Sequence, residues 1–114
     1  MTRVKRGITS HRKHKKLLSL TKGYRGTKSK LVKMAHEAAL HAGEYAFAGR
    51  KNKKRDFRRL WITRIGEASK AEGISYSRLI DGLTKNNIKI DRKILADLVL
   101  NDIEVFKKIV GAVR

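Results

Sequence analysis

The densest cluster of chemically active side chains lies between Ala46 and Ile65, in the stretch AFAGRKNKKRDFRRLWITRI. These twenty residues contain eight lysines or arginines and one acid, interleaved with Phe47, Phe57 and Trp61. On a helix, like charges four residues apart repel each other, and each such pair costs about 0.2–0.5 kcal/mol. Because a solvated surface normally mixes both signs of charge, this pattern favours binding to a polyanion.

The charge of the whole chain supports the same interpretation. The 114 residues include 29 lysines and arginines against 10 acids, a net charge of +19. Residues 1–60 hold 19 basic and 3 acidic side chains, whereas residues 61–114 hold 10 and 7. A chain of this charge repels itself until an anion neutralises it, so a polyanion is the expected partner. The first half of the chain carries most of the charge for that partner.

The histidines His36 and His41, in the segment HEAALH, do not have the spacing of a zinc site. Zinc-binding helices place two histidines four residues apart, whereas five residues turn the second by about 140° around the helix. The chain has no cysteine to complete such a site. It also has no Ser/His/Asp set and no glycine-rich phosphate loop with its lysine. We therefore expect no enzyme activity, no metal and no cofactor.

Several other classes of protein are disfavoured by composition. Without cysteine no disulfide can form, which fits a reducing compartment. The basic N-terminal run has no apolar segment after it, so a secretory signal is not expected. No apolar run approaches the roughly 20 residues of a membrane helix. A basic amphipathic helix on an anionic membrane surface remains an alternative.

The basic residues of the first half are expected on two helices. Thr9 or Ser10 can cap a helix through residues 11–22, and Gly23 can end it in left-handed geometry. The tetrapeptide GYRG then forms a connector. From Thr27 or Ser29, apolar residues recur at helical spacing to about residue 72, with no convincing stop before Gly73.

The last forty residues predict three short helices. Ser75 or Ser77 can cap the first, which Asn86-Asn87 can end in left-handed geometry. Asp91 can cap the second, and Asp102 or Asn101 the third. Because three short helices form a core near the lower limit of size, we expect the end of the long helix to join them as a fourth member. The expected core residues are Trp61, Ile65, Leu79, Ile80, Leu83, Leu95, Leu98, Phe106 and Ile109.

The fold class is therefore all-α, with two parts. Residues 1–58 are expected to form a basic, extended helical arm, and residues 59–114 a small globular bundle. Phe57, Leu60, Trp61 and Ile65 are expected to share a face toward that bundle. Among the aromatic residues, core packing is favoured over base stacking for Trp61. Tyr24, between two glycines and next to Lys22 and Arg25, favours contact with RNA, by stacking or by a phosphate hydrogen bond.

Five segments together resemble one known family. They are TRVKRG at 2–7, KGYRG at 22–26, KRDFRRLWITRI at 54–65, SYSRLIDGL at 75–83 and IDRKILADL at 90–98. In this order they are similar to the bacterial large-subunit ribosomal protein L20 family, over nearly the whole chain. Gly66 stands where that family usually has Asn or Ser, which could loosen the long helix.

The resemblance implies a non-enzymatic protein whose N-terminal extension is threaded through large-subunit ribosomal RNA and whose helical C-terminal domain sits on that RNA. It implies a role early in subunit assembly and, in some bacteria, repression of the protein's own messenger by the C-terminal domain. Ribosomal RNA, neighbouring large-subunit proteins and that messenger are the expected partners. We expect no membrane partner and no homo-oligomer. The expected location is the cytoplasmic ribosome, with an organellar ribosome as an alternative.

The residues expected to contact ribosomal RNA are basic, apart from one tyrosine. They are Arg3, Lys5, Arg6, His11, Arg12, Lys13, His14, Lys15, Lys16, Lys22, Tyr24, Arg25, Lys28, Lys30, Arg50, Lys51, Lys53, Lys54, Arg55, Arg58, Arg59, Arg64, Arg78, Arg92 and Lys93. Tyr45 and Phe47 stay unassigned. Two other classes share these features: a DNA-compacting architectural protein, and a cationic coiled-coil scaffold. Repulsion between Ala-rich stripes flanked by positive charge disfavours the scaffold.

Overall fold

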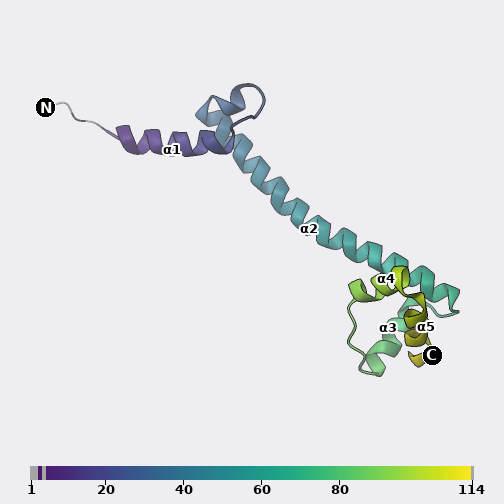
Figure 1. Ribbon diagram of the computed structural model, residues 1–114. Helices are drawn as coiled ribbons and strands as arrows, with labels where there is room; N and C mark the ends of the chain where they lie inside the picture. Colours follow the sequence, from purple (N-terminus) through teal and green to yellow (C-terminus); the bar gives the residue numbers. More distant parts are fainter. Residues whose placement is uncertain (1–2, 4, 114) are drawn as a thin grey trace. The chain divides into compact units, whose positions relative to one another are not determined.

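The computed structural model describes residue 3 and residues 5–113 (Figure 1). Their elements are α1 (Gly7–Leu20), the 3₁₀ helix η1 (Gly26–Ser29), α2 (Val32–Ala71), α3 (Tyr76–Lys85), α4 (Arg92–Asn101) and α5 (Ile103–Val113). No strand occurs in this described part, which confirms the all-α fold class. The chain separates into an N-terminal unit, Met1–Lys51, and a C-terminal unit, Asn52–Arg114, and α2 contributes to both.

Helix α1 begins at Gly7, so the prediction that Thr9 or Ser10 caps it is wrong. The N-cap position is Arg6, whose φ of 63° is left-handed and whose side chain makes no capping hydrogen bond. The Thr9 hydroxyl lies inside the first turn and donates to the Arg6 carbonyl at 3.4 Å. The helix ends at Leu20, and Gly23 has the predicted left-handed φ, at 86°.

Helix α2 begins at Val32, later than the predicted Thr27 or Ser29. Those two residues belong to η1, where the Ser29 hydroxyl donates to the Gly26 carbonyl at 3.3 Å and so does not cap α2. The Thr27 carbonyl accepts the amides of Lys30 and Leu31 at 3.0 and 2.9 Å. A single 3₁₀ turn followed by a helix keeps apolar residues at nearly helical spacing, which is why periodicity alone joined them.

Helix α2 stops at the predicted place, through a Schellman motif. Gly73 has a left-handed φ of 76° and its amide donates to the Lys70 carbonyl at 2.9 Å. The next amide, of Ile74, donates to the Ser69 carbonyl at 3.0 Å, and the Ile74 side chain is buried. This pair of bonds satisfies carbonyls that the helix end would otherwise leave without partners. The helix is continuous through Gly66.

The starts and stops of the three short helices follow local chemistry, with one exception. The Ser75 hydroxyl accepts the Arg78 amide at 3.4 Å, and Asn87 ends α3 with a left-handed φ of 54°. Asp102 accepts the Val105 amide at 3.2 Å near the start of α5. Asp91 occupies the N-cap position of α4, but its side chain makes no capping hydrogen bond.

The C-terminal unit holds one continuous apolar core. In Figure 1, α3, α4 and α5 gather around the last turns of α2. Among the expected core residues, Ile65, Leu79, Leu83, Leu95 and Phe106 are buried, and Trp61, Ile80, Leu98 and Ile109 are partly buried and pack against them. Ile74, Ala96 and Val110 complete the cluster, and the core residue list from the sequence lacked them.

Two members of the expected apolar face on α2 do not reach this core. Phe57 and Leu60 are 44% and 41% exposed, so their assignment to a face toward the bundle is wrong. The Phe57 ring instead stacks on Trp61, with centroids 6.0 Å apart and an interplanar angle of 29°. The packed face of α2 therefore begins at Trp61, one turn later than the spacing of apolar residues indicated.

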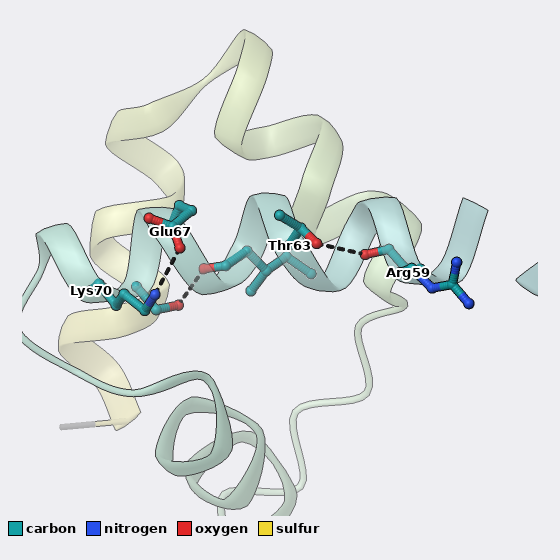
Figure 2. Close-up of polar contacts among 6 residues, drawn as sticks. Arg59, Thr63, Glu67 and Lys70 are labelled. Atoms are coloured by element: carbon teal, nitrogen blue, oxygen red, sulfur yellow. Dashed lines mark hydrogen bonds and ion pairs between the residues drawn. The ribbon is translucent and has the colours of Figure 1, made fainter. Parts of the chain in front are cut away.

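Polar side chains in this part of α2 bond within the helix (Figure 2). The Thr63 hydroxyl donates to the Arg59 carbonyl at 3.1 Å, and Lys70 pairs with Glu67 at 2.7 Å. Ser69 is fully buried, and its hydroxyl donates to the Ile65 carbonyl at 2.7 Å. Because each hydroxyl finds its acceptor one turn earlier, α2 can enter the core without an unsatisfied donor.

The N-terminal unit has almost no core. Among its described residues only Thr21 and Ala35 are buried. The Thr21 hydroxyl donates to the Leu18 carbonyl at 3.4 Å. With so little apolar surface removed from water, the folded state of this unit gains little from the hydrophobic effect. The sequence of this unit therefore supplies exposed side chains rather than a buried core.

Candidate nucleic-acid interface

Helix α2 exposes the whole basic cluster of residues 50–59. Every residue from 43 to 60 is exposed. The one acid in the cluster, Asp56, lies 3.8 Å from an Nη atom of Arg59, and both side chains are solvated. An ion pair in water contributes little, because solvent screens it and the long side chains lose entropy. The members of this cluster that were expected to contact RNA are Arg50, Lys51, Lys53, Lys54, Arg55, Arg58 and Arg59.

The basic residues before α2 are also exposed. Helix α1 presents Arg12, Lys13, Lys15 and Lys16 with His11 and His14, and contains no acid. Arg3, Lys5 and Arg6 precede it, and Lys22, Arg25, Lys28 and Lys30 lie in and around η1. The sequence of the N-terminal unit has 14 lysines and arginines against two acids, Glu37 and Glu44. Such a surface concentrates anions near it.

Tyr24 lies in the turn between α1 and η1. Its side chain is 37% exposed and borders a pocket of about 430 Å³ on the adjoining part of α2. Tyr45, which the sequence left unassigned, lines the same pocket from α2. The structure therefore brings together two tyrosines that are 21 residues apart in the sequence.

Three of the four expected basic contacts after residue 60 line two pockets of the C-terminal unit. Arg64 and Lys93 line one of about 520 Å³ together with Trp61. Arg78 lines another, of about 450 Å³, with Lys85. Arg92 is half-buried, and its Nε donates to the Tyr76 hydroxyl at 2.9 Å. That bond uses one of the five guanidinium N–H donors and holds the group in a set direction.

Neither a metal centre nor a membrane span is found in the described residues. Their His, Asp and Glu side chains form no group of three or more that could hold a metal ion. None of the described helices combines the length and apolar character needed to cross a bilayer. The two histidines of HEAALH are both exposed, and the Nδ1 of His41 lies 3.7 Å from Glu44.

Comparison with known proteins identifies the family. The family model described as ribosomal protein L20 matches residues 3–109. The chain belongs to the L20 family. It is 51% identical to the large ribosomal subunit protein bL20 of Marinobacter nauticus, over 96% of this chain and 94% of the relative. It is 54% identical to the bL20 proteins of Chloroflexus aurantiacus, over 96% and 92%, and of Pelobacter propionicus, over 100% and 97%.

Membership of the L20 family sets the class of protein. L20 is a structural ribosomal protein of the bacterial type and is not an enzyme, so this chain has a structural role in the ribosome. Its location is the ribosome in the cytoplasm. The resemblance to the L20 family is thus confirmed.

One feature of this interface had no signal in the sequence of this L20 protein. The Tyr76 hydroxyl accepts a hydrogen bond from Arg92, which is 16 residues away. That contact depends on how α3 and α4 pack, and no local pattern encodes it. Lys85, in contrast, lines the same pocket as Arg78 because the two residues lie seven apart on one face of α3. The Lys85 Nζ is paired with Asp81 at 2.7 Å.

Proposed function

We propose that this chain binds large-subunit ribosomal RNA directly and supports early assembly of the subunit by neutralising and bridging RNA segments. The observation that carries the proposal is the N-terminal unit, whose 14 basic residues and two acids surround almost no core. A unit with so few buried residues and so many exposed positive charges is suited to lie between the phosphates of neighbouring RNA segments.

The physical gain comes from the phosphates. Where RNA segments converge, their backbones repel each other, and lysine and arginine side chains placed between them lower that repulsion. Each neutralised phosphate also releases condensed counterions. The logarithm of the binding constant should therefore fall with the logarithm of the salt concentration, with a slope of about 0.7–0.9 per phosphate contact. RNA binding would in turn remove the repulsion between like charges in residues 50–59.

The C-terminal unit supplies a second contact of a different kind. We infer that it recognises a helical junction of the RNA by shape, through Arg78, Arg92 and Lys93. The bond between Arg92 and Tyr76 supports this assignment, because an oriented guanidinium matches a phosphate with two parallel hydrogen bonds. In this proposal residues 1–58 act as the arm and residues 59–114 as the RNA-binding domain.

Further partners belong to the same proposal. Neighbouring large-subunit proteins would contact the exposed apolar residues of α4 and α5, such as Leu100 and Ile103. The protein's own messenger would be a second RNA ligand of the C-terminal unit, and binding there would repress translation. The protein acts as one copy, and a monomeric result in sedimentation would support that assignment over a self-associating scaffold.

Nuclease footprinting on large-subunit ribosomal RNA tests the proposal. The parent chain should protect two sets of nucleotides. Arg58→Ala should weaken one set and Arg92→Ala the other, while Lys107→Ala, whose Nζ is paired with Glu104 at 3.3 Å, serves as the control. Uniform loss of every protection with either variant would contradict a two-part surface. Equal affinity for duplex DNA at matched salt would favour an architectural DNA-binding protein instead.

A further inference from the structure

We propose that the pocket between Tyr24 and Tyr45 captures an unpaired nucleobase of the bound RNA. The inference rests on the proposed function and adds to it a site for a base, whereas the basic residues account only for phosphates. The pocket, called here the Tyr24–Tyr45 pocket, lies within the N-terminal unit. Its floor is Met34, Ala38 and Ala42, one face of α2.

The size and lining of the Tyr24–Tyr45 pocket suit a flat aromatic ligand. Its volume of about 430 Å³ falls within the roughly 300–1,000 Å³ of small-molecule sites. The Tyr45 ring is 71% exposed and stacks on His41, with centroids 6.1 Å apart and an interplanar angle of 24°. A preformed pair of stacked rings, one of which is largely exposed, is the kind of platform on which unpaired bases stack.

The charges around the pocket favour a base over a phosphate. Both acids of the N-terminal unit are here: Glu37 lines the pocket, and Glu44 lies 3.7 Å from His41. In a unit with 14 basic residues, these two carboxylates make this the place least attractive to a phosphate group. A neutral base meets no such repulsion. Lys28, which also lines the pocket, is placed to pair with the phosphate of the same nucleotide.

The turn that carries Tyr24 leaves room for an RNA backbone. Gly23 and Gly26 flank Tyr24 and have left-handed φ values of 86° and 68°, which residues other than glycine rarely adopt. A Cβ atom added at either glycine would meet no atom within 4 Å. The chain is therefore open on this side, so a sugar–phosphate backbone can approach Tyr24 without displacing protein atoms.

The test uses the full chain and two RNA hairpins. One carries a single unpaired 2-aminopurine, whose fluorescence is quenched by stacking, and the other is the same hairpin fully paired. The parent chain should quench the fluorophore and bind the first hairpin about 5- to 150-fold more tightly, the range expected for one base stacked on an aromatic residue. Tyr45→Ala should abolish both the quenching and the preference.

Phe47→Ala is the matched control. Phe47 is also an exposed aromatic of α2, but it lies under the Lys51 ammonium, 5.4 Å from its ring centroid, and does not line the pocket. Its loss should leave the preference for the unpaired base unchanged. A preference that Phe47→Ala lowers as much as Tyr45→Ala would overturn the inference, because any exposed ring would then serve.

The remaining outcomes separate this inference from the proposed function. If the parent chain binds both hairpins equally, with a steep salt dependence, the pocket does not bind a base and this inference is overturned. The proposed contacts with phosphates would then still be supported. That result would also be expected if a side chain of a neighbouring protein fills the pocket in the ribosome. If neither hairpin nor ribosomal RNA is bound in a salt-dependent manner, the proposed function itself fails, and this inference with it.

Discussion

The Nε of Arg92 donates a hydrogen bond of 2.9 Å to the Tyr76 hydroxyl, which joins the first residue of α4 to the first residue of α3. Both side chains are half-buried. Since a half-buried guanidinium is partly desolvated, this bond is stronger than its equivalent in water. It also fixes the direction of a group that is a candidate for phosphate binding.

Tyr76→Phe should therefore weaken both the fold and RNA binding. Removing the acceptor should lower the free energy of unfolding by about 0.5–1.5 kcal/mol, the usual net contribution of a hydrogen bond. Affinity for ribosomal RNA should fall by less than with Arg92→Ala, because the Arg92 guanidinium keeps its charge but is no longer held in one direction by the Tyr76 hydroxyl. In the Arg92→Ala background, Tyr76→Phe should have no further effect on affinity. Additive losses in this double-mutant cycle would show that the two side chains act separately.

Arg58→Ala should reduce the salt dependence of RNA binding. Loss of one phosphate contact is expected to lower the logarithmic salt slope by about 0.7–0.9, equally for different RNA sequences. Lys107→Ala should leave the slope unchanged, since Lys107 lies in α5 and pairs with Glu104. The measurement is the dissociation constant at several salt concentrations. An unchanged slope for Arg58→Ala would remove this residue from the interface.

Gly82→Ala and Gly66→Ala should change stability in opposite directions. Alanine is normally favoured over glycine inside a helix by about 0.5–1 kcal/mol. A Cβ at Gly66 would lie 3.9 Å from the Tyr76 Cβ, an ordinary contact, so Gly66→Ala should stabilise the protein. At Gly82 it would lie 2.9 Å from both the Cβ and the carbonyl oxygen of Val113, which should cost about 1–3 kcal/mol.

Thermal or denaturant unfolding of both variants measures this difference. Equal stabilisation by the two substitutions would mean that the end of α5 moves away from α3 at little cost. A destabilised Gly66→Ala variant would mean that the contact with Tyr76 is tighter than its distance indicates.

Residues 50–59 should be the least protected part of α2 when no RNA is bound. Like charges four residues apart weaken the helix there, and no described side chain from 43 to 60 is buried. In amide hydrogen exchange of the full chain at low salt, this segment should exchange faster than the amides around Leu79 and Leu95. Ribosomal RNA should slow it. Protection equal to that of the core, without RNA and at low salt, would contradict this.

Much of the architecture could be predicted from the sequence because its causes are local. The stops at Gly23 and at Asn86-Asn87, the end of α2 before Gly73, and the cap at Ser75, one of two serines considered, depend on a few neighbouring residues and agree with the sequence predictions. The start of α1 was not predicted correctly, because Arg6 has a left-handed φ that residues other than glycine rarely adopt, and its side chain makes no capping hydrogen bond. The 3₁₀ helix η1 was missed for a different reason: it keeps apolar residues at nearly helical spacing, so periodicity alone joined it to α2.

The sequence by itself determined the helical class, the polyanionic partner and the family, since charge, apolar spacing and ordered motifs are properties of the chain before it folds. Only the tertiary structure decided which apolar residues of α2 pack against the core. Phe57 and Trp61 are one turn apart, yet only Trp61 packs against the core, because α3, α4 and α5 cover the last turns of α2. The same packing brought Arg92 to Tyr76, and the fold of the turn before α2 brought Tyr24 to the pocket that Tyr45 lines.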